Sequence, residues 1–210
     1  MNEVLLLVEG QTEETFVRDL LQPYFKRMGL SLTYRIEGGV VNYKKVKLQI
    51  LLSCKENGAR HVSTMFDLYG LPGNFPGKNS PKWAQCRNGA DKAAVVEHEM
   101  ICDINQPNFI PYIQVHEFEA LLFTDPSYFA KWTDDPQIVQ TLQEVRVSCA
   151  PEDINDSKNT APSKRILSIM PTYQKVIHGS SIARSIGLDA MRAACPHFGG
   201  WLQKLEALVD

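Results

Sequence analysis

The chain opens on five consecutive apolar residues, Val4 to Val8, followed by an acid, a glycine and a polar segment. An unbroken apolar run of this length is typical of a parallel strand buried on both faces. Thr12 is then expected to cap a helix with Glu13 and Glu14 in its first turn, where the helix dipole favours acids. Glu9 would therefore lie at the carboxyl end of the first strand, the sheet edge where ligands collect in α/β folds.

Strand and helix patterns then alternate through about residue 124. Apolar residues at helical spacing predict helices up to Gly29, around 46–54 and over 90–104. Shorter apolar or alternating runs predict strands at 32–36, 61–67 and 109–115. The stretch 68–81 is rich in glycine and proline and too long for a hairpin, so we expect a surface loop with the composition of a mobile one.

Beyond this point the pattern becomes helical. Helix starts are indicated at Asp125-Pro126, Asp135-Pro136 and Ala161-Pro162, and a last helix is expected from Trp201 to Val209. The predicted fold class is α/β in three layers, with a mostly parallel sheet of about four or five strands and an added C-terminal helical region. Residues 1–124 would form the core and 125–210 the helical region packed on it, with a single domain overall as the alternative.

The composition is that of an ordinary globular protein. Of the 210 residues, 44% are apolar and 22% are charged, and the formal net charge is -2, so the whole molecule has no strongly basic footprint. The five cysteines are widely spaced without a C-x-x-C pair, which favours free thiols in a reducing cytoplasm. We expect neither a signal peptide nor a membrane span, because no basic segment precedes the first apolar run and no run approaches about 20 residues.

The charge is unevenly distributed along the chain. The segment from Lys158 to Lys204 contains seven basic residues and a single acid, Asp189. This segment could guide a phosphate backbone toward an acidic N-terminal site. The alternative is a set of solvated surface charges without a common role.

Acids follow three of the predicted strands. Glu9 follows the first, Asp67 ends the third, and His116-Glu117-Phe118-Glu119 follows the fourth. Since the connections are helical, these strand ends should share one edge. Converging carboxylates are what Mg²⁺ requires. For any single acid, a helix cap or a surface charge is the better explanation, but three strands ending in this way favour a metal site.

The same residues resemble a known family. The first turn, VEGxTE at residues 8–13, together with Asp67, resembles the Toprim domain of topoisomerases, primases and OLD-type nucleases. Three longer motifs are more specific: MFDLYGLP at 65–72, HEFEALLF at 116–123 and APSKR at 161–165. Together they resemble an uncharacterised bacterial family of small Toprim-like proteins, a domain of unknown function that is often encoded beside an SMC/ABC-type ATPase. The resemblance covers nearly the whole chain.

This resemblance implies a nuclease that depends on Mg²⁺ or Mn²⁺ and acts with an ATPase in defence against foreign DNA. It assigns Glu9 general acid/base or metal roles and makes Asp67 a metal ligand. Toprim domains carry a second aspartate where this chain has Tyr69, and a phenol with a pKa of about 10 is a poor Mg²⁺ ligand. Either Glu117 or Glu119 would then supply the missing ligand, or the site would bind metal weakly or not at all.

OLD-type nucleases also place a lysine near the scissile phosphate. Lys164 is the candidate for that role and Arg165 for a further nucleic-acid contact, with solvated helix charge as the alternative for both. Five other residues are expected to shape the site: Gly10, Thr12, Glu13, Tyr69 and His116. The last of these could ligate a metal, but a histidine at a strand end is more often structural.

The expected partners are nucleic acid, above all DNA, the neighbouring ATPase and a second copy of the chain. The alternative from a different class is a non-catalytic adaptor of the ATPase, favoured by the tyrosine at position 69. A third alternative is a phosphatase or nucleotidyl transferase whose loop at 68–81 closes over a small phosphorylated ligand.

Overall fold

The computed structural model describes residues 2–39, 41–56, 60–154 and 160–209. Within these ranges the strands are β1 Glu3–Val8, β2 Ser31–Ile36, β3 Arg60–Asp67, β4 Phe109–Ile110 and β5 Ile113–Gln114. Their order is β2-β1-β3-β4, β5 also pairs with β3, and each of these pairings is parallel. The predicted α/β class with a mostly parallel sheet is confirmed.

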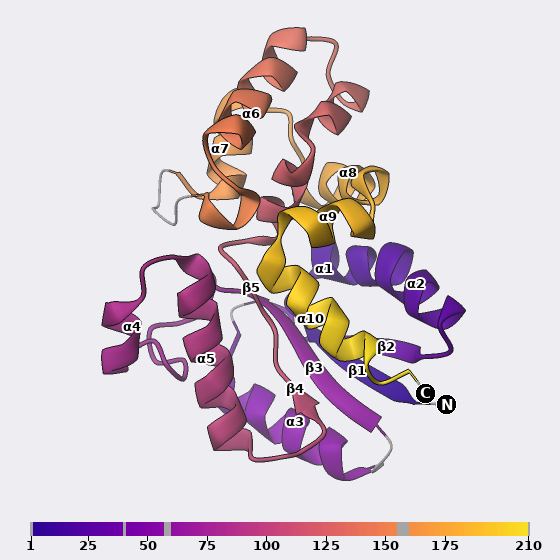
Figure 1. Cartoon of the computed structure of the whole chain (residues 1–210), viewed down its shortest axis with the longest axis vertical. Coiled ribbons are helices and arrows are strands. Elements are labelled where there is room, and N and C mark those ends of the chain that lie inside the picture. Colours follow the sequence, from indigo (N-terminus) through magenta and orange to yellow (C-terminus); the bar gives the residue numbers. More distant parts are fainter. Residues whose placement is uncertain (1, 40, 57–59, 155–159, 210) are drawn as a thin grey trace.

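Helices cover both faces of this sheet (Figure 1). The α-helices are α1 Gln11–Phe16, α2 Gln22–Arg27, α3 Tyr43–Glu56, α4 Pro81–Gln85, α5 Gly89–Ile104, α6 Pro136–Ser148, α7 Pro162–Ile169, α8 Ser180–Ile186, α9 Leu188–Ala194 and α10 Pro196–Glu206. Two π-helical turns, η1 Val17–Leu21 and η5 Lys175–Gly179, and three 3-10 helices, η2 Phe118–Thr124, η3 Pro126–Lys131 and η4 Pro151–Asp153, complete the described helices.

The apolar run of β1 is buried on both faces, as its sequence predicts. Val4 and Leu6 point into a core cluster that includes α1, α2 and α10, whereas Leu5 and Leu7 point into a second cluster with α3 and α5. Successive strand residues face opposite sides of the sheet, so one run of large apolar residues supplies both cores. The result is a three-layer arrangement centred on β1 and β3.

The last helix returns to the sheet. The indole Nε1 of Trp201 in α10 donates a hydrogen bond to Ser63 Oγ of β3 at 3.0 Å, and Trp201 stacks on Tyr112 with ring centroids 4.3 Å apart. Near the two ends of the chain, Asn2 Nδ2 donates to Leu208 O at 2.6 Å. Side chains from the N-terminal strand and from α10 therefore share one core, while the boundary at residue 124 stays a prediction.

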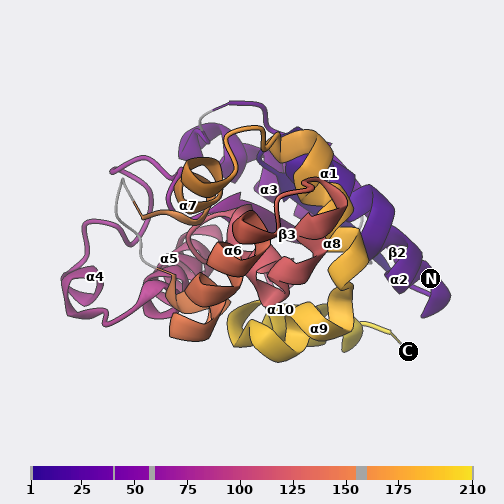
Figure 2. The same ribbon diagram turned by 90° about the horizontal axis from the view of Figure 1, so that it is seen from above.

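The helices from η2 to α8 form a helical cap. Figure 2, seen from above, shows α6, α7 and α8 lying over the sheet, and Figure 1 places them beyond the carboxyl ends of the strands. This is the sheet edge where the acids of the sequence were expected to meet. No helix within the described ranges is both long and apolar enough to cross a membrane.

The prediction of one continuous fourth strand over 109–115 is wrong. The strand is split into β4 and β5, with Pro111 and Tyr112 between them. Proline has no N–H to donate to a ladder, so the pairing with β3 is interrupted there. Thr64 of β3 fills the gap: its hydroxyl accepts from Tyr112 N at 3.0 Å and lies 3.0 Å from Tyr112 O.

Several helix boundaries also differ from the prediction. Gly10, rather than Thr12, is the N-cap of α1, and Glu13 accepts the Gly10 N–H at 3.0 Å. Thr12 is buried inside the first turn. The last helix begins at Pro196 instead of Trp201, because proline suits a first helical turn. Asp125 caps a 3-10 helix, η3, by accepting the Ser127 N–H.

The loop after β3 is more ordered than its composition predicts. Leu68, Leu71 and Phe75 are buried in the core cluster formed with α3 and α5. Successive turns are closed by backbone hydrogen bonds, among them Phe75 N to Pro72 O at 3.0 Å. The loop runs over the surface as predicted, but its apolar side chains anchor it to the core.

The Thr64 bridge gives a test of the split strand. Replacing Thr64, which is fully buried, with valine keeps the strand propensity but leaves the N–H of Tyr112 without its acceptor. We expect the free energy of unfolding to fall by about 1–3 kcal/mol, the usual cost of an unsatisfied buried donor. Urea titration measures it. Thr33→Val at an exposed site on β2 is the matched control and should change stability by less than about 0.5 kcal/mol. Equal stabilities for the two variants would contradict the bridging role.

Candidate functional site

The chain reverses its direction of travel across the sheet at β1. It moves from β1 to β2 on one side and then crosses back to β3 on the other, which makes the crevice between β1 and β3 a topological switch point. In open α/β sheets ligands bind outside the carboxyl ends of the strands at such a point. Glu9 directly follows β1 and Asp67 ends β3, so the two acids flank this crevice.

Glu9 is tied to the end of the neighbouring strand. Its Oε2 accepts the backbone N–H of Asp67 at 3.2 Å. The turn that follows is closed by Gly70 N donating to Asp67 O at 3.0 Å, and a Cβ on Gly70 would lie only 3.1 Å from Glu9 Oε1. The glycine in the predicted motif therefore leaves room for the Glu9 carboxylate beside the turn.

Asp67 joins three elements at this edge. It is 6% exposed; its Oδ1 accepts the Phe118 N–H at 2.9 Å, which fixes the start of the 3-10 helix η2 against β3. Its Oδ2 lies 3.4 Å from Lys175 Nζ, at the beginning of the π-helical turn η5. One carboxylate thus connects the sheet, the segment after β5 and the helical cap.

Lys175 is surrounded by acids from separate segments. Its Nζ lies 3.3 Å from Glu119 Oε2, 3.4 Å from Asp67 Oδ2 and 3.7 Å from Glu13 Oε1. The Glu119 side chain is fully buried, and the side chain of Lys175 is 39% exposed. We call Glu9, Glu13, Asp67, Glu119 and Lys175 the acid–lysine cluster.

Burial dominates the ionisation of these acids. It raises the pKa of Asp67 and of Glu119, and the positive charge of Lys175 opposes this rise at both. Burial also raises the pKa of Glu9, against the hydrogen bond from the Asp67 backbone. Burial lowers the pKa of Lys175, but Asp67, Glu119 and Glu13 outweigh it, so the net shift is upward and the amine stays charged.

The carboxylate oxygens of the cluster are suitable ligands for a hard cation, but the amine of Lys175 occupies the centre of the cluster. Three buried carboxylate oxygens, Glu13 Oε1 and both oxygens of Glu119, accept no well-aligned hydrogen bond within the described residues, although the Lys175 amine lies 3.7 Å from Glu13 Oε1 and 3.3 Å from Glu119 Oε2. Oxygen ligands of this kind fit Mg²⁺ or Mn²⁺. However, the described part of the chain contains no group of three or more His, Cys, Asp or Glu side chains arranged to hold a metal ion. A divalent cation could enter this cluster only if Lys175 moved out.

Glu117 lies beside the cluster, at the cap. Its Oε2 accepts the backbone N–H of Ser163 at 2.9 Å, in the first turn of α7. Lys164 follows Ser163 and is exposed, and Arg165 Nε donates to Thr160 O at 2.9 Å. The predicted roles of these residues stay predictions; the structure places them around the first turn of α7, next to the acids.

His116 and Tyr69 meet at the backbone. Tyr69 N donates to His116 O at 3.0 Å, and His116 adopts a left-handed conformation with φ of 61°. The buried ring of His116 places Nε2 3.0 Å from Glu152 O, the hydrogen-bonded arrangement expected of a structural histidine. Tyr69 is 38% exposed and lines a small pocket next to the acid–lysine cluster.

Few of the basic residues between Lys158 and Lys204 contact the acids of the candidate site. Lys175 joins the acids, and Arg192 pairs with Glu206. Lys158 lies outside the described residues. All five cysteines lie in described segments and are free thiols, as predicted.

From the sequence, Lys175 was one of the basic residues of the C-terminal third without a role of its own, and Gly70 had no assigned role. No spacing rule connects a lysine at position 175 with acids at 9–119, because the contact depends on the path of the cap. Gly70 could have been noticed, since it lies in the motif that begins at Met65. The reason for a glycine at this position is visible only in the structure, where Glu9 lies beside it.

Comparisons with known proteins bear on the whole chain. A family model described as a domain of unknown function, DUF4276, matches residues 8–206. The C-terminal region of the Burkholderia pseudomallei OLD protein has 14% identity and a TM-score of 0.47, with coverage of 97% of this chain and 98% of that one. The corresponding region from Xanthomonas campestris pv. campestris has 16% identity and a TM-score of 0.46, covering 98% and 96%. No curated protein matches the chain. At these sequence identities and TM-scores, the function of the OLD proteins is not carried over to this chain.

Removing the cation from the cluster should destabilise the fold in a pH-dependent way. Lys175→Met leaves three acids without their counter-ion, and we expect the free energy of unfolding at pH 8 to fall by about 1–3 kcal/mol. This is less than the loss for a fully buried pair, because Lys175 is partly exposed.

The loss should be smaller at pH 5. The raised carboxyl pKa values mean that the folded state binds more protons than the unfolded state, so stability falls as the pH rises above about 4. Without Lys175 these pKa values rise further and the fall extends to higher pH. Urea titrations at pH 5 and pH 8 measure the difference. Lys55→Met, at an exposed site on α3, is the control; a pH-independent effect of Lys175→Met would refute the coupling.

Proposed function

The chain belongs to the DUF4276 family, and we propose that it is a Toprim-type phosphodiesterase that cleaves nucleic acid with Mg²⁺ or Mn²⁺. The observation that carries this proposal is the convergence of Glu9 and Asp67 at the switch point, where Glu9 accepts the backbone N–H of Asp67 and the Asp67 carboxylate lies beside the Lys175 amine. Buried acids grouped at the mouth of a parallel sheet are costly unless a cation balances them. Their position at the edge where ligands bind in open α/β sheets therefore favours a catalytic use.

Glu9 and Asp67 would hold the metal, with Glu119 or Glu117 as the further ligand. A bound divalent ion supplies Lewis acidity toward a phosphoryl oxygen and lowers the pKa of water. Glu9 is the candidate to accept a proton, and burial raises its pKa above that of an exposed glutamate. Lys175, displaced from the acids, would turn its ammonium group to a phosphate oxygen, and Lys164 on α7 would contact the strand further along.

The proposal extends to the partners named by the sequence motifs. DNA is the proposed substrate, an SMC/ABC-type ATPase the proposed partner, and defence against foreign DNA in the cytoplasm the proposed setting. A homodimer is part of the same proposal. What supports these assignments is the resemblance of the motifs at 65–72, 116–123 and 161–165, whose residues line or border the site.

A non-catalytic adaptor is the second candidate. The three ion pairs of Lys175 favour it, since they give the acids an internal counter-ion and a purely structural purpose. Tyr69 in place of a carboxylate favours it as well. In this case the cluster would only join the cap to the sheet.

The nuclease proposal is tested by cleavage of plasmid, linear and single-stranded DNA and of RNA, with and without the ATPase. We expect Mg²⁺- or Mn²⁺-dependent cleavage that Glu9→Gln/Asp67→Asn reduces by on the order of 100-fold or more, the loss typical of acid–base groups. Asp135→Asn/Glu144→Gln makes the same two chemical changes at exposed sites on α6 and should cleave like the wild type, because asparagine caps a helix as well as aspartate does. Cleavage that survives the Glu9/Asp67 double change would refute the assignment.

Calorimetry separates the two candidates. The nuclease proposal predicts Mg²⁺ or Mn²⁺ binding at millimolar concentrations that is lost in Glu9→Gln/Asp67→Asn. Absence of binding to the wild type, alone and with the ATPase, would support the adaptor.

A further inference from the structure

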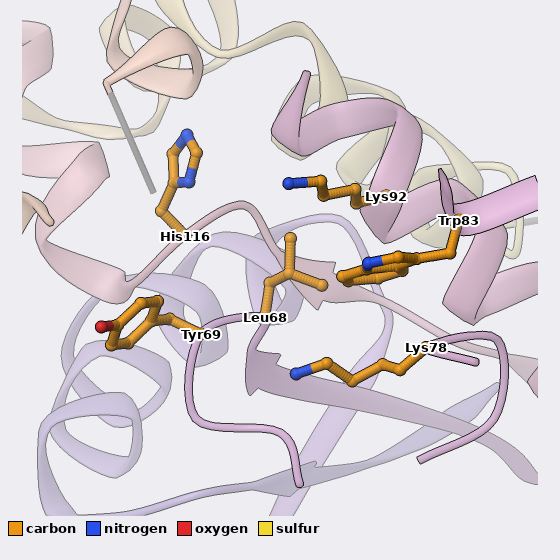
Figure 3. Close-up of a pocket in the computed structure, with 6 residues that line it drawn as sticks. All are labelled: Leu68, Tyr69, Lys78, Trp83, Lys92 and His116. Atoms are coloured by element: carbon orange, nitrogen blue, oxygen red, sulfur yellow. The ribbon is translucent and has the colours of Figure 1, made fainter. Parts of the chain in front are cut away.

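The outward side of helix α5 is exposed over its last three turns. The buried residues of the helix, spaced by three or four from Ala93 to Ile104, face the core, and Lys92 extends toward the pocket beside Tyr69 (Figure 3). Residues three or four positions apart share one face of a helix. The outward stripe, as we call it, consists of five exposed residues at this spacing: Ala94, His98, Ile101, Cys102 and Asn105.

Two residues of the outward stripe are spaced as ligands of one metal ion. His98 Nδ1 lies 3.6 Å from Cys102 Sγ, one helical turn further on, and the His98 side chain is 61% exposed. Thiolate and imidazole are typical ligands of Zn²⁺, with bonds of about 2.3 Å to sulfur and about 2.0–2.1 Å to nitrogen. At a tetrahedral angle, ligand atoms at these bond lengths are about 3.6 Å apart. The two side chains therefore need little rearrangement to bind zinc together.

One chain supplies only half of such a site. Glu99 Oε1 also lies 3.7 Å from His98 Nδ1, but Lys82 Nζ lies 3.6 Å from the same oxygen. Over the part of the chain that the structure describes, no three or more His, Cys, Asp or Glu side chains are arranged to hold a metal ion. Structural zinc sites are almost always closed by four protein ligands. A closed site on α5 thus needs two ligands from another molecule.

The surface around the pair suits a second copy of the same helix. Ala94, Ile101 and Asn105 carry no charge, and Ile101 is 50% exposed. Two outward stripes can therefore face each other without repulsion between like charges, and contact would remove Ile101 of both copies from water. A twofold axis through the metal brings a second His98 and Cys102 to the same ion. The two thiolates of the completed site balance the charge of Zn²⁺.

We propose that His98 and Cys102 of two copies bind one Zn²⁺ and so join the chains through α5. As each sulfur forms its bond to zinc, its thiol proton passes to solvent, and one ring nitrogen of each histidine supplies a lone pair. The inference rests on the proposed function only for the expectation of a homodimer. It requires neither metal nor substrate at the acid–lysine cluster.

The test is size-exclusion chromatography with light scattering, which measures molar mass, together with a zinc titration. A phosphine reductant keeps the thiols reduced, so that a disulfide cannot link the copies. We expect a monomer in EDTA and a twofold higher molar mass with zinc, at one Zn²⁺ per two chains. Excess EDTA added afterwards should restore the monomer.

Single changes test the two ligands. Cys102→Ser and His98→Gln keep a polar side chain at an exposed position, and both variants should stay monomeric with zinc. Cys149→Ser makes the same change at a free thiol on another helix boundary and should dimerise like the wild type. Cys102→His offers zinc a different ligand at the same spacing and should restore the dimer that serine abolishes. Thermal unfolding shows that each variant is folded.

Ile101→Lys tests the surface separately from the ligands. It leaves both ligands in place but sets two positive charges beside each other at the twofold axis. The zinc-dependent dimer should then form only at higher protein concentration than in the wild type. Dimerisation unchanged by this substitution would show that the outward stripe is not the contact surface, which would overturn the inference.

The outcomes are separable from those of the cleavage assay. Glu9→Gln/Asp67→Asn changes the acid–lysine cluster and leaves the outward stripe intact, so this variant should dimerise with zinc like the wild type. The inference is overturned if the wild type is a dimer in EDTA, or if zinc leaves its molar mass unchanged. It is equally overturned if Cys102→Ser and His98→Gln dimerise with zinc as the wild type does.

Discussion

The structure depends on the balance of charge around Lys175. Asp67, Glu119 and Glu13 reach this amine from a strand, a 3-10 helix and the first helix, so one cation holds the sheet and the cap together. Buried carboxylates without such a partner would be protonated or would open the structure to water. The same balance keeps this group of acids together at the carboxyl edge of the sheet.

The fold supplies the geometry for this balance. The reversal of the chain at β1 leaves the ends of β1 and β3 side by side, and the backbone N–H of Asp67 fixes Glu9 across that boundary. The segment after β5 then closes over the crevice, because Asp67 accepts the N–H of Phe118.

Much of the sheet could be predicted because its signals are local. The apolar run of β1 and the helical spacing of Val46, Ile50 and Cys54 depend only on nearby residues, and the structure confirms both elements. The split of the fourth strand could not be predicted from the apolar pattern, which continues through Pro111. Only the missing N–H of this proline indicates the interruption. Glu9 and Asp67 could be placed at the same edge of the sheet because helices connect the strands. Lys175 could not, since its position depends on how a helical cap with weak sequence signals folds back over the sheet.

We propose that the acid–lysine cluster accepts a divalent cation in exchange for Lys175. The decisive experiment is a crystal structure of the protein soaked in Mn²⁺, with anomalous scattering to locate the metal. We expect manganese at about 2.0–2.6 Å from oxygens of Glu9 and Asp67, and Lys175 Nζ moved away from the acids. Lys175 still in contact with Asp67, Glu119 and Glu13, with no anomalous peak between Glu9 and Asp67, would contradict it.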